Sequence, residues 1–116
     1  MSVSAGIHTV IYPVSDLARA KALYTACQGQ APSFDTPYYV GWRVGDQDIG
    51  LDPHGHRKGM TGPVGYLEVP DIRQRLEQLL ASGAEQLQAV SDVGGGKLIA
   101  SVKDADGNII GLMQSP

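Results

Sequence analysis

Three side chains of this 116-residue sequence could transfer a proton near neutral pH: His8, Tyr66 and Glu68. Imidazole, phenol and carboxylate groups all serve as general acids or bases in enzymes. The sequence lacks a GxSxG motif, a Cys–His pair with an obvious orienting group, and a GxGxxG motif opening a helix. Nucleophilic and nucleotide-dependent enzymes are therefore disfavoured, and the three residues are candidates for a metal-independent lyase or isomerase.

Three other features attract attention but are better explained structurally. His54 and His56 lie two residues apart in a glycine-containing segment, where no third metal ligand follows at a suitable spacing. The run Gly94-Gly95-Gly96 lacks the spacing of a phosphate loop and is typical of a hairpin tip. Cys27, the single cysteine, falls on the apolar stripe of a predicted helix, so we expect a buried thiol in a reducing compartment.

An internal repeat indicates how these residues are positioned. The triplet Ile-Gly-Leu occurs at residues 49–51 and again at 110–112, and each copy follows a strand-to-helix junction, at Asp16 and at Asp71. Hydrophobic periodicity predicts a helix after each of these two aspartates, which are suited to cap it. The same patterns predict strands at residues 7–14, 38–44, 47–52, 64–69, 85–90, 97–102 and 109–114.

The chain resembles, over essentially its whole length, the vicinal oxygen chelate superfamily, which includes glyoxalase I, bleomycin-resistance proteins, fosfomycin-inactivating transferases and extradiol dioxygenases. Two segments are the most specific motifs of this resemblance. They are residues 8–17, His-Thr-Val-Ile-Tyr-Pro-Val-Ser-Asp-Leu, and residues 104–112, Asp-Ala-Asp-Gly-Asn-Ile-Ile-Gly-Leu. The resemblance implies an α+β fold in which two βαβββ modules form a cup-shaped, partly open mixed β-sheet with helices on the outside. We expect one domain over 1–116, with modules at 6–52 and 64–114 and a linker at 53–63.

The resemblance also implies up to four metal-ligand positions, on the first and last strand of each module. The last-strand positions, a glutamate in family metalloenzymes, are here Gly50 and Gly111, and the second module's first-strand position is Val64. The remaining position is either His8 or Thr9, which face opposite sides of a strand. Because one imidazole cannot hold Zn²⁺ or Fe²⁺, we expect no metal and no cofactor.

Strand alternation predicts what lines the cup if both glycines face it. On the aromatic strand, either Tyr38 and Trp42 or Tyr39 faces the same space. The predicted ligand-binding residues are Tyr38, Trp42, Asp48, Gly50, Asp52, Tyr66, Glu68, Ile109, Gly111 and Met113. Aromatic walls and carboxylates favour a planar aromatic ligand, with a preference for cations.

Composition limits the partners. The net charge is −3 and no run of lysine or arginine occurs, which disfavours nucleic acid and membrane surfaces. No stretch approaches the roughly 20 apolar residues of a membrane span, and the first residues lack signal-peptide features. We therefore expect a cytoplasmic protein with a small-molecule partner. The resemblance implies a homodimer and leaves open whether modules pair within or between chains.

Two functions follow from these predictions. The first is a metal-free small-molecule-binding protein similar to the bleomycin-resistance branch, which confers antibiotic resistance by sequestering a drug-like molecule. The second is a metal-free lyase or isomerase that uses His8, Tyr66 or Glu68 as general acid or base. We favour binding, because it accounts for the glycines and the aromatic strand without requiring an acid–base pair.

Overall fold

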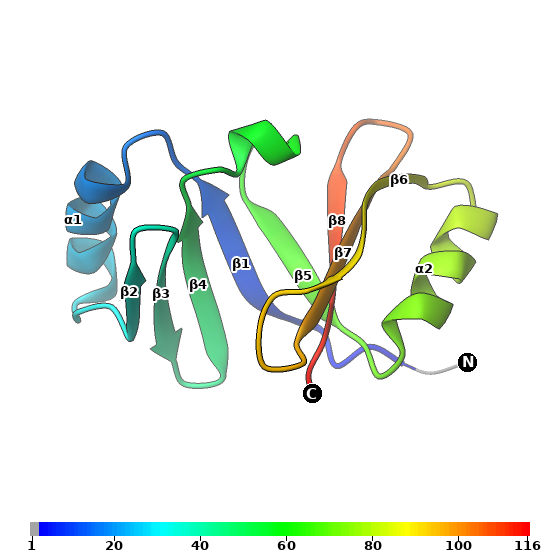
Figure 1. Ribbon diagram of the computed structural model, residues 1–116, viewed down its shortest axis with the longest axis horizontal. Coiled ribbons are helices and arrows are strands. Elements are labelled where there is room, and N and C mark those ends of the chain that lie inside the picture. The colour runs from blue at the N-terminus through cyan, green and yellow to red at the C-terminus, as the bar shows by residue number, and fades with distance from the viewer. Residues whose placement is uncertain (1–2) are drawn as a thin grey trace. The chain divides into compact units, whose positions relative to one another are not determined.

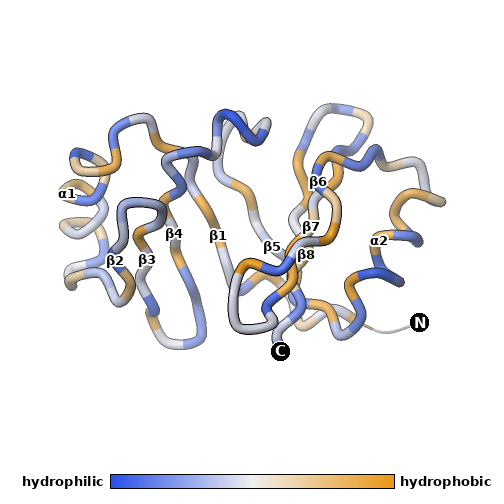
Figure 2. The backbone as a smooth tube through the Cα atoms, in the orientation of Figure 1, coloured by the Kyte–Doolittle hydropathy of each residue, from blue (hydrophilic) through white to orange (hydrophobic). Residues whose placement is uncertain are grey.

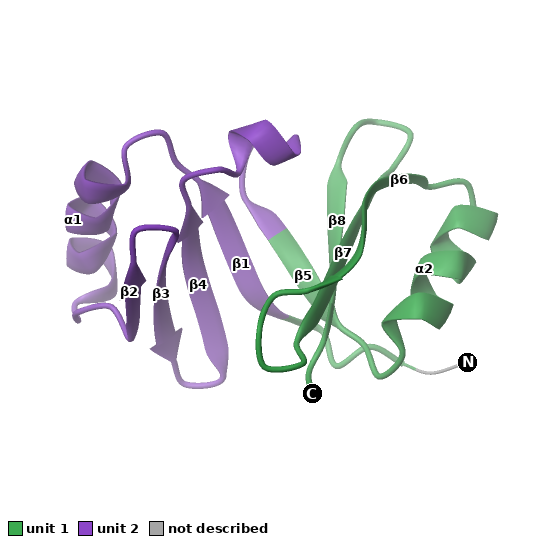
Figure 3. Ribbon diagram, viewed as in Figure 1, with its two compact units in different colours: residues 1–7, 65–116 green, residues 8–64 purple. Residues whose placement is uncertain are grey.

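The computed structural model describes residues 3–116, and in this range it contains eight β-strands and two α-helices (Figure 1). Met1 and Ser2, which begin the segment expected to lack signal-peptide features, lie outside the described residues. The chain divides into two compact units: unit 2 is His8–Val64, and unit 1 comprises residues 1–7 and 65–116 (Figure 3). Both follow the predicted order β-α-β-β-β, and the fold class is α+β.

Unit 2 contains a mixed sheet in the order β2-β3-β4-β1. Its first strand, β1, pairs parallel to β4, whereas β3 pairs antiparallel to both β2 and β4. Their bounds are β1 Ile7–Pro13, α1 Leu17–Gln28, β2 Phe34–Thr36, β3 Tyr39–Val44 and β4 Gln47–Asp52. The short edge strand β2 was missed from the sequence, because three residues are too few to show an alternating pattern.

Helix α1 begins where the sequence predicts, directly after Asp16. The Asp16 carboxylate accepts a hydrogen bond from the backbone N–H of Arg19 at 3.0 Å, and Gly29 ends the helix with φ of 71°, a left-handed conformation that favours glycine. Its packing is looser than the apolar stripe suggests, since Leu23 is 62% exposed. Cys27 is also exposed, so the prediction of a buried thiol is wrong.

Unit 1 repeats this arrangement, with its strands in the order β5-β8-β7-β6. Strand β5 pairs parallel to β8, and β7 pairs antiparallel to β8 and β6. The bounds are β5 Val64–Glu68, α2 Ile72–Ala81, β6 Glu85–Asp92, β7 Leu98–Lys103 and β8 Ile109–Gln114. As predicted, Asp71 caps α2 by accepting the backbone N–H of Gln74 at 3.1 Å.

Each unit buries one face of its sheet beneath its helix. In unit 2 the core under α1 is Val40, Trp42 and Leu51. In unit 1 the side chains under α2 are Val69, Ile72, Leu76, Ala100, Val102 and Leu112. Hydrophobic and hydrophilic positions alternate along α2, as expected for a helix that packs one side against a sheet (Figure 2).

The segment predicted as a linker, residues 53–63, belongs to unit 2. It contains the short 3₁₀ helix η1, His56–Lys58. A Cβ at Gly55 would lie 2.7 Å from Cβ of Pro13, so glycine is required where this segment passes close to β1. Among residues 3–116, no helix has the length and apolar character that a membrane crossing requires.

Candidate functional site

The two Ile-Gly-Leu triplets place a glycine on the sheet face opposite the helix in each unit, and we call this the glycine face. In unit 2, Gly50 is paired with Gly41 of β3 on one side and with Ile11 of β1 on the other. Its neighbour Leu51 belongs to the core under α1. Because successive side chains of a strand alternate between faces, Gly50 points away from that core.

The glycine face of unit 2 is covered by Tyr39. A Cβ at residue 50 would lie 2.7 Å from Cε1 of Tyr39 and closer still to its hydroxyl oxygen. A Cβ at Gly41 would lie 3.0 Å from Cε2 of the same ring. The tyrosine ring therefore fills the space where a side chain of residue 50 would begin.

Unit 1 shows the same relationship with a different strand. Gly111 is paired with Tyr66 of β5 on one side and Ser101 of β7 on the other. A Cβ at residue 111 would lie 2.5 Å from Cδ1 and 2.7 Å from Cγ of Tyr66. In both units, then, a tyrosine ring lies over the glycine at the expected last-strand ligand position.

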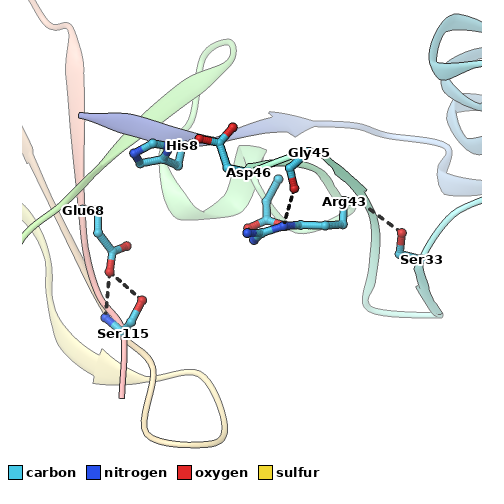
Figure 4. Close-up of polar contacts among 8 residues, drawn as sticks. His8, Ser33, Arg43, Gly45, Asp46, Glu68 and Ser115 are labelled. Carbon is cyan, nitrogen blue, oxygen red and sulfur yellow. Dashed lines mark hydrogen bonds and ion pairs between the residues drawn. The ribbon is translucent and has the colours of Figure 1, made fainter. Parts of the chain in front are cut away.

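The choice between His8 and Thr9 is decided by the register of β1. Thr9 pairs with Asp48 and Ile11 pairs with Gly50, so Thr9 shares the glycine face and is 4% exposed. The His8 side chain is 38% exposed, and its Nδ1 lies 3.7 Å from the carboxylate of exposed Asp46 (Figure 4). Thr9 is therefore the residue at the first-strand position.

These residues do not fit a transition metal. The four positions that the resemblance assigns to metal ligands are occupied by Thr9, Gly50, Val64 and Gly111, none of which offers an imidazole, thiolate or carboxylate. Tyrosine rings fill the space beside both glycines. Within residues 3–116 no three or more His, Cys, Asp or Glu side chains are grouped so as to hold a metal ion, and this includes His54 and His56.

Each carboxylate predicted to attract a cation already has a partner. Asp48 forms an ion pair with Arg43 at 2.8 Å, and Asp52 pairs with Lys58 at 2.8 Å. Asp52 also accepts the backbone N–H of His54 at 2.8 Å. The negative charges that were expected to attract a cationic ligand are therefore balanced by Arg43 and Lys58.

Glu68 is also engaged, within unit 1. One of its carboxylate oxygens accepts hydrogen bonds from the backbone N–H and the hydroxyl of Ser115, at 3.1 and 2.5 Å (Figure 4). The carboxylate thus fixes the segment that follows β8. This contact gives Glu68 a structural role that its position in the sequence did not indicate.

On the aromatic strand β3, Tyr39 lies on the glycine face and Trp42 does not. Trp42 is 1% exposed, packs in the core under α1, and donates its indole N–H to the carbonyl of Gln30 at 3.0 Å. Tyr38 precedes β3 and is 73% exposed. Choosing Tyr38 and Trp42 rather than Tyr39 for the glycine face is therefore wrong, because the register of β3 turns Trp42 toward the helix.

The remaining predicted residues keep their expected faces. Ile109 and Met113 alternate with the core residue Leu112 and so share the face of Gly111, where Met113 is 5% exposed. Sequence reasoning missed Ser101, which pairs directly with Gly111 and is 2% exposed. The available signal was a lone polar residue within the apolar run of residues 98–102.

Comparison with solved structures assigns the fold to a class. The chain matches a methylmalonyl-CoA epimerase from Mycobacterium tuberculosis with a TM-score of 0.75 and 18% identity, over 100% of this chain and 92% of the other. It matches a Mn(II)-bound glyoxalase from Novosphingobium aromaticivorans with a TM-score of 0.72 and 17% identity, over 98% of this chain and 40% of that longer one.

A third match is a member of the glyoxalase/bleomycin resistance/dioxygenase superfamily from Vibrio splendidus, with a TM-score of 0.67 and 14% identity over 97% and 100% of the two chains. No protein-family model and no curated protein matches the sequence. The fold is therefore that of the vicinal oxygen chelate superfamily, as the two sequence motifs predicted. At these identities the likeness establishes the fold alone.

Proposed function

We propose that this chain is a metal-free protein that binds a planar aromatic small molecule on its glycine faces, as bleomycin-resistance proteins sequester drug-like ligands. The observation that supports the proposal most is the tyrosine ring over glycine in each unit. Tyrosine offers a large apolar surface with a polar tip, which is suited to stacking on a planar ligand.

The proposal favours a neutral ligand over a cation. Asp48 and Asp52 are ion-paired and Glu68 accepts two hydrogen bonds from Ser115. A cation would have to compete with Arg43 for Asp48 and with Lys58 for Asp52. At Glu68, one of the two carboxylate oxygens is already occupied by Ser115. We therefore propose that the protein selects its ligand by planar shape, in place of the preference for cations predicted from the sequence.

Equilibrium dialysis with three planar bicyclic probes tests this proposal: 2-naphthol, N-methylquinolinium and 2-naphthoate. We expect 2-naphthol to bind at least as tightly as the cation. Replacing Tyr39 or Tyr66 by leucine should weaken binding about 2- to 10-fold, the loss expected for one aromatic contact. Tyr38→Leu, at an exposed tyrosine, is the matched control and should leave affinity unchanged. Failure of all three probes to bind at millimolar concentration would contradict the proposal.

The alternative is a metal-free lyase or isomerase, and one similar structure is an epimerase. Of the three candidate acid–base residues, Tyr66 and Glu68 lie on the glycine face of unit 1, where Glu68 accepts hydrogen bonds from Ser115. His8 alternates with Thr9 and therefore lies on the opposite face of β1. Mass spectrometry of each bound probe after long incubation with catalytic amounts of protein separates the two functions. A changed mass or isomer would favour the enzyme.

The proposal includes the homodimer implied by the resemblance. Unit 2 carries exposed apolar side chains, with Leu23 at 62% and Phe34 at 56% exposure, which a second copy could cover. Light scattering should give about twice the chain mass. A mass near 12.3 kDa at tens of micromolar protein would contradict the dimer without affecting the binding proposal.

A further inference from the structure

The hydroxyl of Ser101 is the buried polar group of unit 1 that the fold itself does not explain. Ser101 is 2% exposed, and its Oγ has no hydrogen-bond partner among the described residues. Buried hydroxyls in native proteins are nearly always paired with protein groups, water or a ligand. An unpaired one therefore calls for a partner that is not part of the chain.

The register of β7 fixes the direction of this hydroxyl. Ala100 and Val102, on either side of Ser101, lie in the core under α2. Ser101 itself pairs with Gly111, which pairs in turn with Tyr66. Ser101 consequently shares the glycine face, and because residue 111 has no side chain, nothing on β8 separates its hydroxyl from the tyrosine.

The repeat shows that the fold does not require a hydroxyl here. In unit 2 the residue paired with the central glycine from the equivalent strand is Gly41. That position thus accepts a residue with no side chain, and alanine in unit 1 would avoid burying an unpaired polar atom. Serine at position 101 is better explained by what binds there than by packing.

We propose that Ser101 Oγ forms a hydrogen bond to a neutral oxygen, carbonyl or hydroxyl, of a planar aromatic ligand on the glycine face of unit 1. This inference rests on the proposed binding function and specifies its ligand class. A hydroxyl both donates and accepts, so it suits either oxygen. A carboxylate is disfavoured because a buried serine alone does not offset the loss of its hydration.

A ligand must displace side chains to reach an atom that is 2% exposed. One large side chain on this face is the Tyr66 ring, which lies over Gly111, the direct partner of Ser101. Rotation of this ring away from Gly111 would make the sheet surface accessible across the three paired residues Ser101, Gly111 and Tyr66. The ligand's ring would then lie beside the tyrosine, with its oxygen toward Ser101.

The test compares two probes that differ by one oxygen, 2-naphthol and naphthalene, by equilibrium dialysis. Wild-type protein should bind 2-naphthol more tightly than naphthalene. Ser101→Ala should weaken 2-naphthol about 3- to 10-fold, as expected for one hydrogen bond, and leave naphthalene within about twofold. Ser91→Ala, at an exposed serine of neighbouring β6, is the matched control and should change neither affinity.

The outcomes separate this inference from the binding proposal. Equal affinity of wild type and Ser101→Ala for 2-naphthol overturns the role of Ser101 while the binding function stands. Binding of neither 2-naphthol nor naphthalene by the wild type overturns both. Ser101→Cys, which keeps the size and most of the shape, provides a second variant, and unfolding of both variants would show a structural role and overturn the inference.

Discussion

The Tyr66 ring stands where a side chain of residue 111 would begin: Cδ1 lies 2.5 Å from the Cβ position of Gly111. Tyr39 stands in the same way over Gly50. Each glycine therefore does more than omit a metal ligand, because its absence of side chain admits an aromatic ring onto the sheet. Restoring a carboxylate at either position would require moving that ring.

We predict that Gly111→Ala destabilises the protein by about 1–3 kcal/mol, the usual cost of overpacking a well-packed site. Urea denaturation measures the effect as a lower midpoint. Gly62→Ala is the control, since a Cβ there meets nothing within 4 Å, and it should stay within about 0.5 kcal/mol.

The destabilisation should depend on the ring. In a Tyr66→Ala background, Gly111→Ala should cost much less, because the colliding group has gone. An equal cost in both backgrounds would show that the contact between residues 66 and 111 is not its source.

A second prediction concerns metal content. We expect well under one Zn, Mn, Ni or Fe per chain after purification without chelators or a polyhistidine tag, because Thr9, Gly50, Val64 and Gly111 supply no strong ligand. Elemental analysis measures this directly. Stoichiometric metal that survives dialysis would show that other residues form a site.

The third prediction separates structural from chemical roles of Glu68. Glu68→Gln should destabilise by less than about 1 kcal/mol, because it weakens a partly exposed hydrogen bond to Ser115 while keeping its shape. Ser115→Ala should cost a similar amount, and the double variant little more than either single one. A loss of turnover of any probe specific to Glu68→Gln would instead assign it to catalysis.

A fourth prediction concerns pH and Asp104. The Asn108 side-chain amide, followed by backbone N–H groups of Asn108, Asp106 and Gly107, holds the pKa of the Asp104 carboxyl below its ordinary value. The pKa of Asp104 is lower in the folded protein than in the unfolded chain. The ionised carboxylate therefore stabilises the fold at pH values above the unfolded pKa, and this stabilisation is lost as the pH falls through the folded pKa. Titration of the Asp104 carboxyl ¹³C signal by NMR measures the folded pKa.

The matched variant for this prediction is Asn108→Ala. It removes the largest cause of the shift, a hydrogen bond of 2.9 Å to the carboxylate, and should raise the pKa of Asp104 toward its ordinary value. Gln86→Ala, which removes an exposed amide elsewhere in unit 1, should leave the pKa of Asp104 unchanged.

Local signals were sufficient for most of the fold. Asp16 and Asp71 cap the predicted helices, and β4 and β8 have the predicted bounds. These features depend on residues close in sequence, where capping and alternation operate. Exposed Cys27 shows the limit of that reasoning, because a helical stripe indicates which side turns inward and not how far the burial extends.

The site was harder to predict because it depends on register between strands. Whether Tyr39 or Trp42 faces Gly50 is fixed by which residue of β3 pairs with β4, and a shift by one residue exchanges the two faces. The partners of Asp52 and Glu68 come from segments whose approach the sequence does not reveal. Ser101 was missed because only the pairing of β7 with β8 shows that its hydroxyl lies beside Gly111.

The two tyrosines occupy non-equivalent places in the repeat. The residue of unit 2 that pairs with its glycine as Tyr66 does is Ile11, and the residue of unit 1 that corresponds to Tyr39 is Ile99. The two ring contacts are therefore not duplicate copies of a single contact inherited with the repeated segment. The ring that covers the central glycine comes from the third strand in unit 2 and from the first strand in unit 1. One tyrosine can therefore be replaced, during evolution or by design, without a matching change in the other unit.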